Sequence, residues 1–275
     1  MEKIKEILID LEQKNDIKII YAVEAGSRAW GFHSEDSDYD IRFIYIYKNS
    51  KRYLSLKPLI DTIDGFSEDR IYDWQGWDIT KCLRLIEKLN PSITEWIYSP
   101  MVYLTDESCQ NLLSTLKELL VKQKRISPLL HHYKSMAKAN YKAHILSKKD
   151  VNIKKYLYVI RPIGMFEWLL KCHKNFDTIS ELIYVNFHRI LQDLKIHLDE
   201  EVYSNILKII EIKMQSKETD LKDRIKCIDD WIESLLGSDD LKNIETKEKE
   251  NLIVSDNFGD DLDNFLHLIL KVKFE

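Results

Sequence analysis

A glycine–serine turn followed by two aspartates is the feature of this chain that points most directly to chemistry. Gly26 and Ser27 end a run rich in β-branched residues, and ten residues separate Ser27 from Asp38, which is followed by Asp40. Side chains two apart on a strand share a face, so both carboxylates and Arg42 project to one side. Two ionised carboxylates this close repel each other unless a cation lies between them. Hard divalent ions, chiefly Mg²⁺, suit this position and commonly bind substrate phosphates as well.

The turn itself has the properties of an anion-binding element. Gly26 allows the backbone to turn sharply and an anion to approach closely. Ser27 is predicted to open a short helix whose free N–H groups point toward that anion. An EF-hand loop is excluded because Ile41 replaces the required glycine and Tyr47 the final glutamate. An aspartyl phosphatase is also excluded, since its apolar strand precedes the aspartates, and the upstream turn disfavours a merely solvated acidic loop.

The surrounding pattern predicts an α+β fold, with a small mixed-sheet domain followed by an all-helical domain. The first fifteen residues and residues 79–89 have helical patterns, the latter with Asp78 as its N-cap, and a short helix follows over 92–98. Strands are predicted at 17–24, 41–47 and 70–77. Further helices are predicted over 106–123, 127–147, 153–173, 178–195, 199–214, 218–236 and 258–272, with a linker at 238–251. The predicted domains are 1–104, 105–237 and, as an acidic linker with a C-terminal helix, 238–275.

Composition places the chain among ordinary globular proteins. Its 275 residues are 44% hydrophobic and 32% charged, with seven Gly and five Pro, which excludes general disorder and fibrous repeats. No apolar run is long enough to span a membrane and no secretion signal opens the chain, so a cytoplasmic location is predicted. The four scattered cysteines are expected to be buried rather than to bind zinc.

Charge is unevenly distributed along the chain. Residues 131–161 carry eight cations and one acid, a net +7, which leaves −12 for the rest of a chain whose net charge is −5. A local basic field in an acidic molecule favours a specific anionic ligand over general adhesion to nucleic acid.

These motifs resemble a known family. The DNA polymerase β-like nucleotidyltransferases share a pattern that begins with an apolar residue, a Gly, and then Gly or Ser. About ten residues later the pattern continues with Asp-x-Asp, which is followed by a strand. The longer stretches 26–32 and 36–42 are similar to the RlaP-type subgroup, predicted to act in RNA repair, as are 76–78, 90–96 and 154–162. The resemblance covers roughly residues 1–175 and leaves the acidic last hundred residues unmatched.

The resemblance implies transfer of a nucleoside monophosphate from a nucleoside triphosphate such as ATP to an acceptor hydroxyl, with release of pyrophosphate. Asp38 and Asp40 would hold two Mg²⁺ ions, with Mn²⁺ as an alternative, while Gly26 and Ser27 would grip the triphosphate. The family also uses a third carboxylate on a neighbouring strand. Asp73 is favoured for this role, because the other candidate, Asp78, already has a role as a helix cap.

Four basic residues complete the predicted site. Arg28 and Arg42 lie inside the motif and are expected to bind the nucleotide or to pair with the site acids. Lys155 and Arg161 belong to the segment 154–161, which starts an otherwise apolar helix. Cations there could reach nucleotide phosphates or an RNA backbone. The lysine stripe over 134–142 is interpreted as a solvated helix face.

The acceptor stays open among three hypotheses. The resemblance favours an RNA 3′ end, of tRNA or another RNA, with the helical domain closing over the nucleotide. The acidic balance favours a second acceptor class, a protein or small-molecule hydroxyl. A third hypothesis, a catalytically silent antitoxin-like protein, is disfavoured by the intact motifs.

Overall fold

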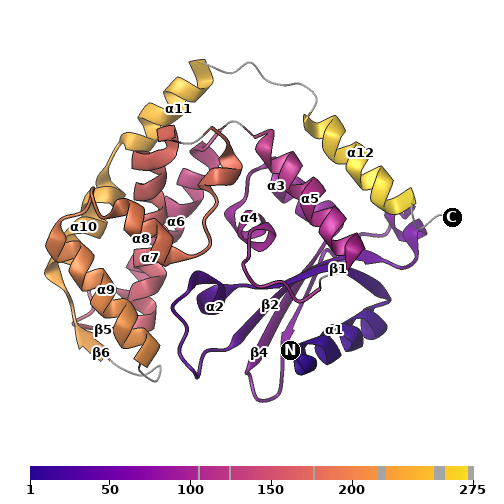
Figure 1. The fold of residues 1–275 in the computed structure, drawn as a ribbon, viewed down its shortest axis with the longest axis horizontal. Coiled ribbons are helices and arrows are strands. Elements are labelled where there is room, and N and C mark those ends of the chain that lie inside the picture. The colour runs from indigo at the N-terminus through magenta and orange to yellow at the C-terminus, as the bar shows by residue number, and fades with distance from the viewer. Residues whose placement is uncertain (105, 124, 176, 216–220, 251–257, 272–275) are drawn as a thin grey trace. The chain divides into compact units, whose positions relative to one another are not determined.

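The structure is a computed structural model that describes residues 1–104, 106–123, 125–175, 177–215, 221–250 and 258–271. The predicted α+β class is confirmed: a mixed sheet occupies the N-terminal part and helices dominate the rest (Figure 1). The chain forms two compact units. The first comprises Met1–Ala29, Asp38–Gln123 and Val254–Glu275, and the second Trp30–Ser37 and Lys124–Ile253. The domain limits expected at residues 104 and 237 stay predictions.

The sheet of the first unit has the strand order β1-β2-β4-β3. Its strands are β1 (Ile17–Glu24), β2 (Tyr39–Tyr47), β3 (Thr62–Phe66) and β4 (Tyr72–Asp78). β2 runs antiparallel to β1 and parallel to β4, whereas β3 pairs antiparallel with β4 at the edge. The parallel pair matters most for the site, because it aligns the starts of β2 and β4.

Helices cover both faces of this sheet (Figure 1). The bounds are α1 (Glu2–Asn15), α2 (Gly26–Trp30), α3 (Ile79–Glu87), α4 (Pro91–Ile97), α5 (Glu107–Val121), α12 (Phe258–Lys271) and a 3₁₀ turn η1 (Ser50–Leu54). Ile4 and Leu8 of α1 pack with Ile41 and Phe43 of β2 in one buried cluster. The odd-numbered residues of β2 therefore face this core, which leaves Asp40 and Arg42 on the opposite face.

The second unit is organised around α7. Its elements are α6 (Ser127–His144), β5 (Asp150–Asn152), α7 (Ile153–Cys172), η2 (His173–Asn175), η3 (Ile179–Leu182), α8 (Phe187–Leu194), α9 (Glu200–Gln215), β6 (Leu221–Asp223), α10 (Lys226–Gly237) and α11 (Asp240–Glu250). α7 is buried along most of its length and packs against α6, α8, α9 and α10. A helix that is apolar nearly all round must be enclosed by others, as this one is.

Two expected features of the second unit were wrong. The helix predicted over 178–195 is divided into η3 and α8, and Asn186 caps α8 by accepting a hydrogen bond from the backbone N–H of His188. Ile183 and Val185, in the connection between them, are buried without being helical, so apolar residues there did not mark a continuous helix. The linker predicted at 238–251 contains α11, because Lys and Glu favour helix and buried Leu241 anchors it against α6.

Three short strands were also not expected. β3 contains Asp64 and Gly65, two residue types that are rare in strands, and β5 is too short to show alternation. A helix was predicted over 218–236, but α10 begins only at Lys226 and residues 221–223 form β6. Residues 216–220 lie outside the described residues. β6 exists because it pairs with β5 across some seventy residues of chain, which no local pattern reveals.

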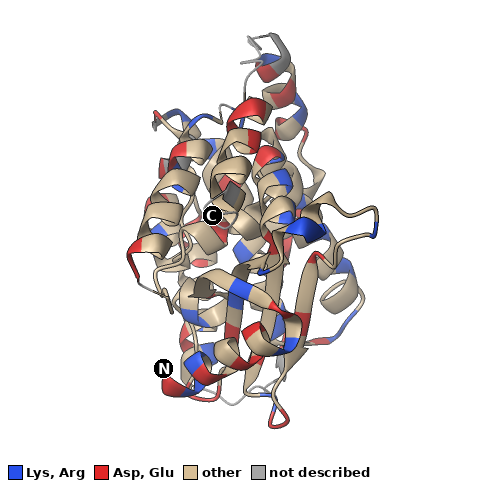
Figure 2. Cartoon of the chain, turned by 90° about the vertical axis from the view of Figure 1, so that its right-hand side faces the viewer, with Lys and Arg blue, Asp and Glu red and all other residues tan. Residues whose placement is uncertain are grey.

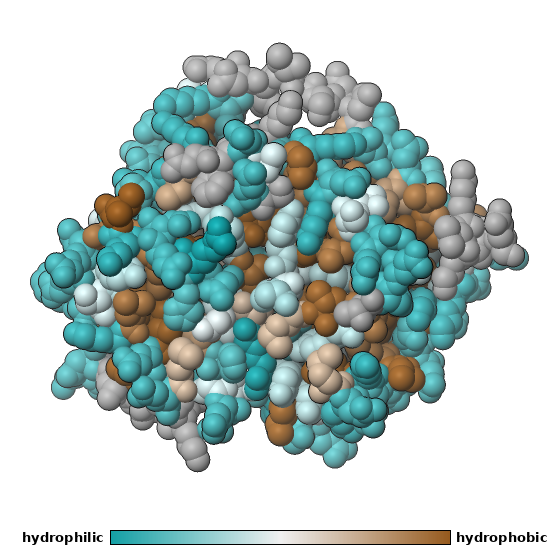
Figure 3. All heavy atoms as spheres, viewed as in Figure 1, coloured by the Kyte–Doolittle hydropathy of each residue, from teal (hydrophilic) through white to brown (hydrophobic). Residues whose placement is uncertain are grey.

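Charged residues of both signs and many hydrophilic residues are visible in the views of Figures 2 and 3. Acidic and basic residues are interspersed along α1, where Lys3 pairs with Glu6 and Lys14 with Asp10 (Figure 2). The face seen in Figure 3 is largely hydrophilic, with hydrophobic residues in scattered patches. None of the helices in the described ranges combines the length and hydrophobicity of a membrane-spanning segment.

Candidate active site

The backbone at Gly26 lies directly against the carboxylate of Asp40. Gly26 has φ +58°, and a Cβ built on it would lie 1.8 Å from Asp40 Oδ2. The neighbouring backbone N–H of Ala25 donates a hydrogen bond of 2.8 Å to the carbonyl oxygen of Asp40. A residue with a side chain would be strained here and would displace the carboxylate, so glycine is required for two independent reasons. The structure thus brings the turn and the second aspartate together.

Asp73 lies beside Asp40 on the neighbouring parallel strand. The two residues are register partners in β2 and β4. Arg42 bridges them: its Nη2 lies 2.9 Å from Asp40 Oδ1 and its Nη1 lies 2.6 Å from Asp73 Oδ1. The side chains of Arg42, Asp40 and Asp73 are 18%, 28% and 49% exposed, so the triad opens toward solvent on the Asp73 side. A cation between two carboxylates is the arrangement that their mutual repulsion demands.

Glu24, which was not among the residues predicted for the site, holds the backbone of Asp40 through a hydrogen bond. It is fully buried at the end of β1, and its Oε1 accepts a hydrogen bond of 2.9 Å from the backbone N–H of Asp40. Its Oε2 accepts a hydrogen bond from the Tyr103 hydroxyl. Burial raises the pKa of Glu24 to about 7, although these two hydrogen bonds oppose the shift. The signal that could have revealed it is a single acid that follows the uncharged run 19–23 and lies immediately before the turn.

Arg28 connects the short helix α2, which contains Ser27, with the segment that carries Asp38. Arg28 donates from Nε to the carbonyl oxygen of Asp38 at 3.2 Å, and its guanidinium stacks 3.9 Å from the centre of the Tyr39 ring. Ser27 is the second residue of α2 and is partly exposed. Asp38 is exposed and precedes β2 by one residue. Arg28 therefore joins α2 to the segment that carries the first aspartate.

Asp78 lies at the far end of β4 and has a structural role. It caps α3: its Oδ1 accepts from the backbone N–H of Thr80 at 2.9 Å and its Oδ2 from the Tyr53 hydroxyl at 2.7 Å. It is fully buried, and burial raises the pKa of its carboxyl group. Of the two candidates for a third carboxylate, the structure brings Asp73, and not Asp78, beside Asp40.

Lys155 and Arg161 belong to α7 in the second unit. The Lys155 ammonium lies 5.0 Å from the centre of the Tyr158 ring. Arg161 is 3% exposed, and its guanidinium stacks 4.2 Å from the centre of the Trp30 ring. Packing inside the second unit accounts for the position of Arg161, and the role of both residues in nucleotide binding stays a prediction.

The acids of the site suit a divalent ion in part. Among the described residues, no three His, Cys, Asp or Glu side chains gather as a metal-binding group. Asp40 and Asp73 nevertheless present carboxylate oxygens on one face, and Mg²⁺ is commonly held by one or two carboxylates plus substrate phosphates. The donor chemistry therefore fits Mg²⁺ when a phosphate-bearing substrate supplies the remaining ligands.

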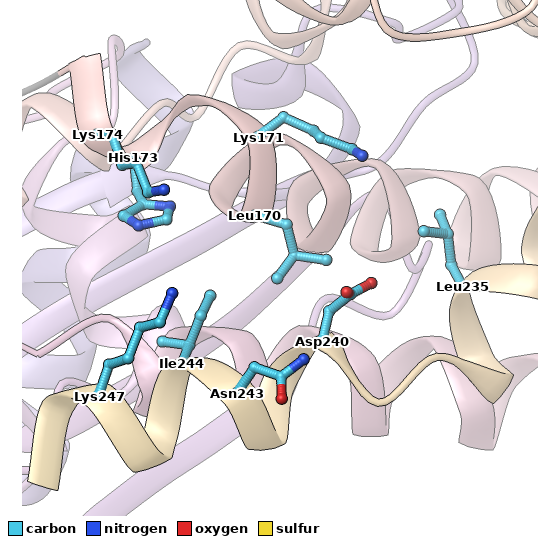
Figure 4. Close-up of a pocket in the computed structure, with 9 residues that line it drawn as sticks. All are labelled: Leu170, Lys171, His173, Lys174, Leu235, Asp240, Asn243, Ile244 and Lys247. Carbon is cyan, nitrogen blue, oxygen red and sulfur yellow. The ribbon is translucent and has the colours of Figure 1, made fainter.

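A separate pocket of about 280 Å³ lies within the second unit, between the end of α7 and α11. Figure 4 shows Leu170 and Ile244 in its middle and His173, Lys174 and Lys247 gathered toward one end. Lys171 and Asp240 also line it, so cations outnumber acids. None of the predicted site residues lines this pocket.

Comparison with known proteins defines the class. A family model described as "RNA repair pathway DNA polymerase beta family", named RlaP, matches residues 1–266. The chain belongs to this family, which suggests a nucleotidyltransferase-like function. It is 35% identical over 233 residues to the uncharacterized protein YcgL of Bacillus subtilis (strain 168), covering 85% of this chain and 84% of that one. The match extends far beyond residue 175, so the limit expected from the sequence was wrong.

Replacing Asp78 is expected to destabilise the fold, whereas replacing Asp73 is not. Asp78→Ala removes a helix cap and leaves three partly buried donors, the Thr80 N–H, the Thr80 hydroxyl and the Tyr53 hydroxyl, without their acceptor. This lowers the free energy of unfolding by at least about 2 kcal/mol. Asp73→Ala removes a half-exposed ion pair and changes it by less than about 1 kcal/mol. Urea denaturation of both variants measures the difference, and equal losses would contradict these assignments.

Gly26→Ala is expected to lower the free energy of unfolding by about 1–2 kcal/mol, the cost of a left-handed backbone for alanine. The matched control is Gly259→Ala, because a Cβ at this helical position meets nothing within 4 Å. Urea denaturation of the control is expected to stay within about 0.5 kcal/mol of the wild type. A loss at Gly26 no larger than at Gly259 would contradict the described turn.

Proposed function

We propose that the protein transfers a nucleoside monophosphate from a nucleoside triphosphate to the terminal hydroxyl of an RNA 3′ end. The observation that carries the proposal is the contact between Gly26 and Asp40, with Asp73 aligned on the next strand. Membership in an RNA-repair polymerase β family supports both the reaction class and the acceptor.

Mg²⁺ is the proposed cofactor, with Mn²⁺ as an alternative. Asp38 and Asp40 would hold two ions, and Asp73 lies close enough to Asp40 to share in binding. When bound, such ions neutralise phosphate charge and stabilise the attacking and leaving oxygens.

The chain's own residues have separable tasks in this reaction. The acceptor oxygen forms a bond to the α-phosphorus as the bond from that phosphorus to the bridging oxygen breaks, and pyrophosphate leaves. The hydroxyl proton passes to a base, a role we assign to Asp73, the most exposed acid of the Asp40–Arg42–Asp73 triad. The turn at Gly26 and Ser27 would hold the triphosphate through backbone N–H groups.

Arginine supplies the remaining positive charge. Arg28 is the third residue of α2 and donates a hydrogen bond to the carbonyl oxygen of Asp38, and Arg42 is already held between two carboxylates. We propose that Arg42 orients both acids and that Arg28 contacts the nucleotide. Lys155 and Arg161 are proposed as further phosphate contacts from the second unit.

Neutralising either central acid is expected to abolish transfer. The assay combines purified protein, each labelled nucleoside triphosphate, an RNA oligonucleotide and Mg²⁺. Asp40→Asn and Asp73→Asn should each lower incorporation by about a thousand-fold, equivalent to several kcal/mol of lost transition-state stabilisation, and EDTA should stop it. The control is Asp64→Asn, an exposed acid on β3, which should retain activity. Turnover that persists in EDTA or in Asp40→Asn would contradict the proposal.

The same assay separates the acceptor hypotheses. Label on RNA supports the proposed acceptor, and label on a protein or small molecule supports the second hypothesis. No pyrophosphate with any acceptor would favour the silent, antitoxin-like alternative.

We further propose that the pocket between α7 and α11 binds acceptor phosphates. Lys171, Lys174 and Lys247 line it around an apolar middle. Asp240 is the acid that lines the pocket, and two further acids of α11 have partners elsewhere: Glu245 with His131 and Glu248 with the backbone N–H of Ile126.

Replacing Lys171, Lys174 and Lys247 together with serine should weaken the binding of a fluorescent single-stranded RNA. The slope of the logarithm of the association constant against the logarithm of the salt concentration should become smaller in magnitude by about 2. The control replaces the exposed lysines Lys5, Lys48 and Lys208, so that net charge changes equally. Equal slopes in the two variants would exclude the pocket as an RNA contact.

A further inference from the structure

The stretch that joins the turn to the aspartates, Trp30–Ser37, packs as part of the second unit. His188 Nε2 lies 2.9 Å from the carbonyl oxygen of Gly31, and buried Phe32 packs edge-to-face on Phe187 with ring centres 6.4 Å apart. Trp30 lies under the Arg161 guanidinium. The chain therefore leaves the first unit after Ala29, is held by α7 and α8, and returns at Asp38.

The end of this stretch is a closed turn that the Lys213 ammonium holds. Ser37 donates its backbone N–H to the Ser34 carbonyl at 3.1 Å, and Ser34 donates its N–H to Ser37 Oγ at 2.9 Å. Lys213 Nζ, from α9, lies 2.8 Å from Ser34 Oγ and 3.4 Å from Ser37 Oγ. All three residues are buried, with Lys213 3% exposed.

Lys213 occupies a position where α9 otherwise places aliphatic residues. The buried face of this helix consists of Val202, Ile206, Ile209 and Ile210, and Lys213 continues it by one more turn. Burying an ammonium costs several kcal/mol before compensation. An aliphatic side chain would fill the space at lower cost, whereas the ammonium binds two serine hydroxyls of the turn.

We propose that Lys213 is a positioning residue for nucleotidyl transfer, which sets where the chain delivers Asp38 to the start of β2. The inference rests on the proposed function. Ser37 is bonded directly to Asp38, so a shift of the turn moves this predicted metal ligand. Asp40 is less dependent on the turn, because Gly26, Arg42 and Glu24 hold it from within the first unit. Loss of Lys213 should therefore act on metal use more than on nucleotide binding.

Lys213→Met tests this assignment, because methionine fills the apolar space without the ammonium. The control, Lys208→Met, makes the same change at an exposed position of α9. With Lys213→Met, kcat is expected to fall about ten- to hundred-fold and the Mg²⁺ concentration for half-maximal rate to rise several-fold. KM for the triphosphate should stay within about two-fold of the control. Hydrogen–deuterium exchange of a peptide over 30–40 should be faster than in the control.

A Lys213→Met protein with the control's magnesium requirement and exchange would overturn the inference. Lower stability with an unchanged magnesium requirement would also overturn it, since that is the signature of a purely structural lysine. If the wild type transfers no nucleotide, the proposed function fails. The rate of hydrogen–deuterium exchange in residues 30–40 then decides alone whether Lys213 anchors the turn. Should Lys213→Met not fold, Ser37→Ala removes one of the same contacts, and the same two measurements apply.

Discussion

The constraint on which this site depends is the absence of a side chain at residue 26. The Asp40 carboxylate occupies the space that a Cβ would take, and the left-handed backbone of Gly26 turns the chain from β1 into α2 at that point. Glu24, two residues earlier, accepts the Asp40 backbone N–H. Glu24, the turn at Gly26 and Asp40 thus meet at one place in the first unit, because the Gly26 backbone and the Asp40 carboxylate are in contact.

Charge compensation explains how acids can be concentrated here. Asp40 and Asp73 come together because β2 and β4 run parallel in register, and Arg42, on the same face, bridges the two. The guanidinium offsets the repulsion between carboxylates. In the proposed reaction the incoming triphosphate and its metal ions would alter this balance, so Arg42 links the stability of the site to its chemistry.

The motif from Gly26 to Asp40 is continuous in sequence, but its residues pack in two different units. The turn and the aspartates belong to the first unit, whereas Trp30–Ser37 is packed into the second. Buried Phe32 and Lys213 show that this connection is held as firmly as a core segment, not as an exposed loop. In the proposed function, the helical unit therefore contributes to the placement of the acids through the chain itself.

The sequence alone determined the features that depend on near neighbours: the amphipathic α1, the strands β1 and β2, the Asp78 cap and the Gly–Ser turn ahead of the aspartates. Hydrophobic periodicity and capping are local, so they can be detected without the fold. Tertiary structure decided the pairing of Asp40 with Asp73, the burial of Glu24 and the reach of Lys213 to Ser34. Each of these joins residues that are distant in the chain or depends on burial by other elements. Strand register and helix packing set such contacts, and no short stretch of residues encodes them.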